Sequence, residues 1–176
     1  MMNQTLRTEG VPAMDRVLIV ANKTLGSDEV AEYVRTRIAK GPCQFTLLVP
    51  ATPRSDYQRG FRFANRLAAV VEGVRSSSDE RDDYEFARTR LDFGLQVLRG
   101  LGATVDGNVG DPNPAKAIPE LLERKQFDEV ALSTLPKGVS RWLHLDIPRQ
   151  VERRFHIPVT VIKVLAVPEQ APVETG

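Results

Sequence analysis

The stretch VLIVANKT, residues 17–24, decides the fold class of this chain of 176 residues. Its first five residues, Val17 to Ala21, are all apolar, which is typical of a strand in a parallel sheet that helices cover on both faces. Three polar residues, Asn22, Lys23 and Thr24, follow directly. Because such sheets bind ligands beyond the carboxyl ends of their strands, we expect a buried first strand that ends at a ligand-binding loop.

Strand-like and helix-like patterns alternate along the rest of the chain. Ser27 and Asp28 precede an amphipathic helical spacing that stops at Gly41 and Pro42. Asn113 and Pro114 have the character of an N-cap and a first helical residue. The alternation predicts an α/β fold, a parallel sheet with right-handed crossovers and helices on both faces. Further strands are predicted at residues 45–49, 103–106, 130–132 and 158–165, and further helices at about residues 61–71, 84–101, from 114 onward and 147–155.

The strand and helix patterns define one domain, residues 16–166, between two tails. Residues 1–15 are polar and aperiodic, which predicts a flexible tail, and the Pro- and Glu-rich residues 167–176 predict a disordered one. Within the domain we expect a helical and acidic insertion at about residues 54–83. Its last part, RSSSDERDD at residues 75–83, is predicted to be a solvated loop.

Composition limits the compartment and the partners that we expect. The 24 Lys and Arg residues nearly balance the 23 Asp and Glu residues, so we expect neither a nucleic acid nor an anionic membrane as partner. Cys43 is the only cysteine, which excludes an internal disulfide and favours a reducing compartment. We find no signal peptide and no run of about 20 apolar residues, and we therefore expect a cytoplasmic protein.

Sequence motifs of known catalytic chemistry are missing from the loops. No Walker loop and no Gly-x-Ser-x-Gly element occurs. Gly100 and Gly102 end a helical pattern, and His144 and His156 lack the spacing of a metal site. Ser133, Ser140, His144 and Asp146 lie in one segment, but nothing there specifies an oxyanion hole, so we expect no catalytic residue and no metal.

The segment after the fourth predicted strand offers groups that suit an anion. It should face Lys23 and Thr24 across the end of the sheet, where hydroxyls, backbone amides and fixed positive charges can hold an anionic group. An alternative of equal weight is that Lys137 and Arg141 are solvated or pair with Asp111 and Asp146. The groups are those of Ser133, Thr134, Lys137, Gly138, Ser140 and Arg141.

Over about residues 16–165 the chain resembles the universal stress protein family. The resemblance rests on the order and spacing of four segments: VLIVANKT at 17–24, VGDPNPAKAI at 109–118, DEVAL at 128–132 and PVTVIKV at 158–164. It implies a Rossmann-like open sandwich of five parallel strands in the order 3-2-1-4-5. It also implies a homodimer that forms through the last strand, Val159 to Val164, whose apolar composition suits an exposed edge.

The chain departs from the ATP-binding members of that family at two places. In those members an aspartate ends the first strand near the adenine and ribose, and a Gly-x2-Gly-x9-Gly-Ser/Thr segment after the fourth strand cradles the phosphates. Here Asn22 replaces the aspartate. Side chains at the glycine positions obstruct the approach of phosphate to the backbone, and a carboxylate would repel it, so we expect ordinary ATP binding to be disfavoured. The motif's four positions hold Leu132, Leu135, Leu145 and Asp146, within the pattern STLPKGVSRWLHLDIP at 133–148, which resembles a variant loop of an actinobacterial branch of universal-stress-like domains.

From these residues and the resemblance we expect a non-catalytic protein that binds a small anionic ligand at the carboxyl ends of strands one and four. ATP, AMP and cyclic nucleotides are the candidate ligands. Asn22 would bond a base or sugar, and the backbone at Val109 and Gly110 would flank the base. Two alternatives stay open: an interaction module with a vestigial pocket, in which residues 54–83 contact a protein, and an enzyme such as a phosphohydrolase or nucleotidyl transferase. The anion would be held by Lys23, Thr24, Ser133, Thr134, Lys137, Gly138, Ser140 and Arg141.

Overall fold

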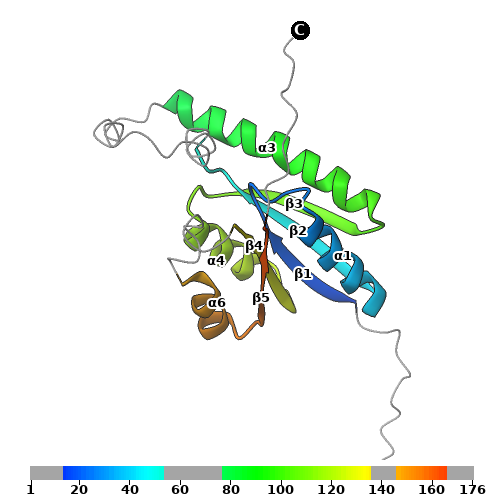
Figure 1. The fold of residues 1–176 in the computed structure, drawn as a ribbon. Helices are drawn as coiled ribbons and strands as arrows, with labels where there is room; N and C mark the ends of the chain where they lie inside the picture. The colour runs from blue at the N-terminus through cyan, green and yellow to red at the C-terminus, as the bar shows by residue number, and fades with distance from the viewer. Residues whose placement is uncertain (1–13, 54–76, 136–145, 166–176) are drawn as a thin grey trace, which may run out of the picture.

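Five parallel strands form the centre of the protein (Figure 1). The structure is a computed structural model, and it describes residues 14–53, 77–135 and 146–165. The strands lie in the order β3-β2-β1-β4-β5, which confirms the predicted fold class and strand order. They are β1 (Asp15–Val20), β2 (Cys43–Pro50), β3 (Thr104–Gly110), β4 (Glu129–Thr134) and β5 (Val159–Lys163).

The central strand β1 explains why the sheet has two covered faces. Val17 to Ala21 are 0% exposed, as the continuous apolar run predicts. Successive side chains of a strand point to opposite faces. Val17 and Ile19 accordingly pack with α1 (Asp28–Lys40) and α3 (Ser77–Gly100), whereas Leu18 and Val20 pack with α4 (Pro114–Arg124) and α6 (Ile147–Phe155). Figure 1 shows these two helix pairs on opposite sides of the sheet.

Local signals set the starts of two helices as predicted. The Ser27 side chain accepts a hydrogen bond from the backbone N–H of Val30 at 3.3 Å, which caps α1. The Asn113 side chain accepts one from Ala115 N–H at 3.0 Å, and Pro114 is the first residue of α4. Each of these helices follows a loop at the carboxyl end of a strand, and both loops lie at the end of the sheet where a ligand is expected.

The loop predicted at residues 75–83 is wrong from Ser77 onward, where α3 begins, although residues 79–82 are exposed to solvent as predicted. Asp79 and Glu80 lie in the first turn of this helix, where negative side chains interact favourably with the N-terminal end of the helix dipole. Asp83 is only 7% exposed and lies one turn before the buried Ala87, on the same face of the helix. Residues 77–83 of the expected insertion thus belong to α3, and the helix predicted at about 61–71 lies outside the described residues.

Several strand boundaries also differ from those predicted. The chain enters β1 at Asp15, inside the segment expected to be a tail. Strand β3 continues to Gly110 through polar residues and glycines that favoured a loop. Strand β3 lies at an edge of the sheet and its residues are mostly half-buried, so polar side chains are tolerated there. The remaining strands shift by one to two residues at their ends, as is usual for element boundaries.

A polar network ties the amino ends of β4 and β5 to α1, at the end of the sheet opposite the predicted ligand site. The Glu129 carboxylate accepts hydrogen bonds from Tyr33 Oη at 2.7 Å and from Thr160 Oγ1 at 2.8 Å. It also pairs with the Arg37 guanidinium at 3.2 Å. Burial, and then the bond to the carboxylate, raise the pKa of the Tyr33 phenol, so the phenol stays a neutral donor. The network holds β5 in place beside β4.

Gly110 provides a test of how closely α4 packs on the sheet. A Cβ atom at Gly110 would lie 2.8 Å from the Cβ of Ala117 and 2.9 Å from Leu48 Cδ1, too close for either contact. We expect Gly110→Ala to lower the free energy of unfolding by about 1–3 kcal/mol, measured by urea denaturation. Gly100→Ala is the matched control, since a Cβ there meets nothing within 4 Å. Equal stability of the two variants would contradict the close packing.

Candidate functional site

The carboxyl ends of β1 and β4 meet at the point where the strand order reverses. The chain leaves β1 toward β2 on one side, and β4 later pairs with β1 on the other side. A hydrogen bond joins the loop after β1 to the end of β4, because Thr24 Oγ1 donates to the backbone carbonyl of Ser133 at 3.4 Å. Thr24 and Ser133, which were predicted to face each other across the end of the sheet, are thus in direct contact.

Two polar atoms at this reversal point are buried and have no hydrogen-bond partner among the described residues. They are Oδ1 of Asn22, a residue 6% exposed, and Oγ of Ser133, a residue 2% exposed. Buried polar atoms are nearly always bonded to protein or to ordered water, and leaving one without a partner costs about 1–3 kcal/mol. These two atoms are therefore positions where a bound molecule can supply the missing hydrogen bonds.

The other half of the Asn22 amide is already bonded. Its Nδ2 donates to Thr52 Oγ1 at 2.7 Å, and Thr52 lies in the loop that follows β2. This bond fixes the orientation of the amide, so the acceptor Oδ1 is the atom left for another partner. No motif in the sequence distinguishes Thr52, although its position just after a strand places it at the same end of the sheet.

The two threonine hydroxyls predicted for the site already donate to backbone carbonyls. Thr24 Oγ1 donates to Ser133, and Thr134 Oγ1 donates to the carbonyl of Leu135 at 3.0 Å. Each hydroxyl therefore retains only its capacity to accept. Of the predicted side chains Asn22, Thr24, Ser133 and Thr134, those of Asn22 and Ser133 have a buried atom without a partner in the described structure.

A buried cation, Arg90, lies beside these residues and was not among those predicted from the sequence. Arg90 of α3 is 5% exposed, and its guanidinium donates a hydrogen bond to the backbone carbonyl of Asn22. Only one other charged residue is buried in the described structure, Asp83, two turns earlier on the same helix. The sequence does hold one signal for the burial of this side chain, because Arg90 lies between Ala87 and Leu91 on the apolar face of the predicted helix.

Helix α3 also supports the rest of the loop that follows β1. Gly26 has φ +83°, and a Cβ there would lie 3.2 Å from the ring of Phe93. A Cβ at Gly94 would lie 3.0 Å from the side chain of Leu25. Both glycines let the loop and the helix approach closely, so the position of the loop depends on α3.

Val109 and Gly110 lie further from the reversal point. They pair with Val49 and Pro50 of β2, which separates them from β1 by one strand, about 10 Å at the usual strand spacing. The carbonyl of Gly110 accepts a hydrogen bond from Ala51 N–H at 3.0 Å. Gly110 therefore packs within the sheet. A ligand that contacts both Asn22 and this backbone must span the distance between the two strands.

Lys23, also predicted for the site, lies half-buried in the loop after β1. The other predicted residues, Lys137, Gly138, Ser140 and Arg141, lie outside the described residues. The described chain resumes at Asp146, which precedes α6 with φ +50° and makes no side-chain cap hydrogen bond. Within residues 14–53, 77–135 and 146–165 no group of three His, Cys, Asp or Glu residues is placed to hold a metal ion. In the same residues no helix is long and apolar enough to cross a membrane.

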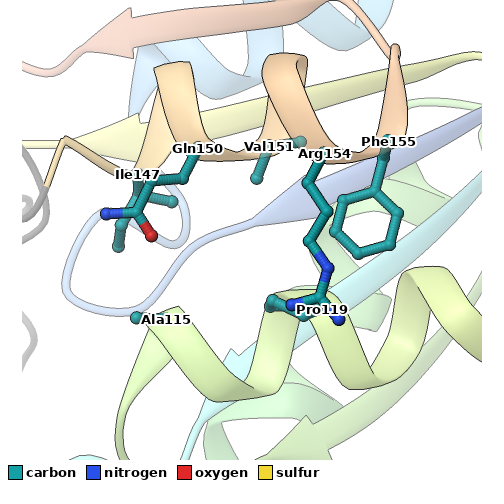
Figure 2. A pocket seen from close by; sticks show the side chains of 7 residues that line it. All are labelled: Ala115, Pro119, Ile147, Gln150, Val151, Arg154 and Phe155. Carbon is teal, nitrogen blue, oxygen red and sulfur yellow. The ribbon is translucent and has the colours of Figure 1, made fainter.

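A shallow groove lies between α4 and α6 on the opposite face from α1 and α3 (Figure 2). Its volume is about 60 Å³, whereas sites for small organic ligands usually measure roughly 300–1,000 Å³. The groove is therefore too small for a nucleotide. It is lined by Ala115, Pro119, Ile147, Gln150, Val151, Arg154 and Phe155.

The protein is thus a doubly wound α/β domain, and its topological switch point holds two buried polar atoms without a hydrogen-bond partner among the described residues. Among solved structures, a universal stress protein family protein from Arabidopsis thaliana has a TM-score of 0.50 and 14% identity, over 86% of this chain and 93% of that chain. The hypothetical proteins PH0823 and MJ0577 reach TM-scores of 0.54 and 0.52 at 16% and 14% identity. Each comparison covers 86% of this chain and 97% of the other.

This chain has the universal stress protein fold, and the resemblance inferred from its sequence is confirmed at the level of the fold. No family model and no curated protein matches the sequence.

The unpartnered atoms lead to a prediction about the protein without ligand. Ser133→Ala removes a hydroxyl that has no partner in the described structure, so we expect the free energy of unfolding to stay the same or to rise. Thr52→Val keeps the shape of the side chain but removes the acceptor of Asn22 Nδ2, so we expect a loss of about 1–3 kcal/mol. Urea denaturation of both variants tests this, and a clear loss in Ser133→Ala would show that the hydroxyl already has a partner.

Proposed function

We propose that this protein is a non-catalytic, universal-stress-like binding protein whose ligand is a nucleotide, held at the carboxyl ends of β1 and β4. The observation that carries the proposal is the pair of buried, unpartnered atoms Asn22 Oδ1 and Ser133 Oγ at the topological switch point. The Arabidopsis thaliana protein of the same fold was solved with AMP bound, which supports the ligand class.

Asn22 and Ser133 differ in what they can bind. Oδ1 of Asn22 is an acceptor only, so it calls for a hydroxyl or amino group, as on a ribose or a base, and not for a phosphate oxygen. The Ser133 hydroxyl can both donate and accept, and it can serve a sugar or a phosphate. We assign Asn22 to the base or sugar of the ligand, and we assign Ser133 to the part of the ligand where the sugar joins the phosphate.

The remaining predicted residues complete the proposal. Lys23, Thr24 and Thr134 flank the switch point, and the backbone at Val109 and Gly110 borders the far side of the base. The segment that follows β4 contributes the groups that hold the phosphate, which we assign to Lys137, Gly138, Ser140 and Arg141.

A short phosphate suits this chain better than a long one. Leu132 stands at the first glycine position of the ATP-binding motif, and its side chain is fully buried in the core under α4 and α6. Leu135 occupies the second position, and Asp146, where the described chain resumes, adds a negative charge at the last. We therefore propose AMP or a cyclic nucleotide before ATP. A cytoplasmic location, where such ligands are abundant and Cys43 stays reduced, belongs to the same proposal.

Ligand binding can be measured directly. We expect AMP at 100 times its Kd to stabilise the protein by about 2.7 kcal/mol, seen as a rise in Tm, and we expect a nucleotide among the small molecules released on denaturation. Lys137→Ala/Arg141→Ala should abolish the rise, because it removes both cations assigned to the phosphate. The matched control is Lys40→Ala/Arg124→Ala, which removes two exposed cations near the C-terminal ends of α1 and α4. Absence of any nucleotide effect would contradict the proposal and favour an interaction module.

We also propose a homodimer that forms through β5, the edge strand of the sheet. We expect light scattering at micromolar concentration to give twice the chain mass of 19.6 kDa. Backbone amides of Val159 to Lys163 should exchange hydrogen more slowly as the protein concentration rises, while those of the opposite edge strand β3 should not change. A mass of one chain, or equal behaviour of both edges, would contradict the β5 dimer.

A further inference from the structure

The hydroxyl of Thr52 lies beside Asn22 at the proposed site, and the function as stated so far gives it no contact with the ligand. Thr52 follows β2 and is half-buried, and its Oγ1 accepts a hydrogen bond from Asn22 Nδ2 at 2.7 Å. A hydroxyl that accepts one hydrogen bond still has its own hydrogen to donate. Within the described residues no acceptor receives that hydrogen, so a ligand can receive it.

The order of the strands places Thr52 in the path of the proposed ligand. Strand β2 lies between β1, which Asn22 follows, and β3, which ends at Gly110. Ala51, the neighbour of Thr52, donates its backbone N–H to the carbonyl of Gly110 at 3.0 Å. A ligand that contacts both Asn22 and Gly110 must therefore cross the carboxyl end of β2, where Thr52 lies.

We propose that Thr52 contacts the ligand and, together with Asn22, determines which edge of a base the site accepts. The accepted edge carries an amino group beside a ring nitrogen, and the rejected edge carries a keto oxygen beside a ring N–H. This inference rests on the proposed nucleotide-binding function.

The hydrogen bond between the two side chains gives the pair a direction. Because Asn22 Nδ2 donates to Thr52, Asn22 presents its acceptor Oδ1 to the ligand and Thr52 presents its hydrogen. This pair complements a base edge with a donor beside an acceptor, such as the amino group and ring nitrogen of AMP. IMP has a keto oxygen and a ring N–H at those two positions, so in the same pose both hydrogen bonds are mismatched.

The backbone of Asn22 is held independently of Thr52. Its carbonyl accepts hydrogen bonds from the N–H of Leu25 at 3.3 Å and from the guanidinium of Arg90. Removal of the Thr52 hydroxyl therefore leaves Asn22 in its place and frees only its amide to turn. Selection of the base edge can in this way be separated from the position of the loop.

Two variants of Thr52 and two nucleotides test the inference. Thr52→Val keeps the shape of the side chain without its hydroxyl, whereas Thr52→Ser keeps the hydroxyl. Calorimetric titration with AMP and with IMP gives the ratio of the two affinities. We expect wild-type protein to bind AMP at least about tenfold more tightly than IMP, because two hydrogen bonds are mismatched in IMP. This ratio should fall about tenfold in Thr52→Val and be retained in Thr52→Ser.

Tyr33→Phe is the matched control. It removes a hydroxyl whose hydrogen bond to Glu129 is also 2.7 Å long, but at the opposite end of the sheet. We expect the ratio of the AMP and IMP affinities to stay at the wild-type value in this variant. Thermal unfolding of every variant without ligand confirms that each comparison is made on folded protein.

The outcomes distinguish the inference from the function on which it rests. Wild-type protein that binds neither AMP nor IMP overturns both. Wild-type protein that binds the two equally, or IMP more tightly, overturns only the inference. An equal loss of affinity for AMP and IMP in Thr52→Val makes Thr52 a structural residue and also overturns it. A fall of the ratio in Thr52→Ser or in Tyr33→Phe overturns it as well, because the Thr52 hydroxyl would then not be the cause.

Discussion

The burial of β1 on both faces is the constraint on which the rest of the structure depends. Its residues from Val17 onward are fully buried, and β1 is hydrogen-bonded to β2 on one edge and β4 on the other. Such a strand meets polar surroundings only at its ends. The change from Ala21 to Asn22 therefore marks where the core stops, and the reversal of strand order makes that point the usual place for a ligand in such sheets. The same apolar run that drives folding thus locates the site.

Local patterns predicted much of this fold, and contacts between distant residues account for what they missed. The apolar runs of the strands and the caps at Ser27 and Asn113 need only a few neighbouring residues, so the sequence alone revealed them. The start of α3 was missed because its charges suggested solvent, although Asp79 and Glu80 suit a helix start. The strand order came from the family resemblance, since pairing partners are set by packing over long separations.

In the candidate site, too, local patterns predicted some features and contacts between distant residues decide the others. The positions of Asn22, Thr24 and Ser133 at strand ends were predictable from the order of the elements. Which of their atoms lack partners was not, because that depends on single bonds such as the one from Thr24 to the Ser133 carbonyl. The contact of Arg90 with Asn22 joins residues 68 positions apart, and only the packing of α3 on the β1 loop reveals it.

The positions that the family resemblance assigns to phosphate-binding glycines hold larger residues in this chain, and this limits how the proposed site can hold a phosphate. Backbone amides bind phosphate only where small residues allow close approach, and here the fully buried Leu132 has turned the first of those positions into core. In the proposed site, side chains such as those of Asn22 and Ser133 would then make contacts that backbone amides make in a glycine-rich loop. The fold can in this way keep its ligand site at the switch point while the chemistry around it changes.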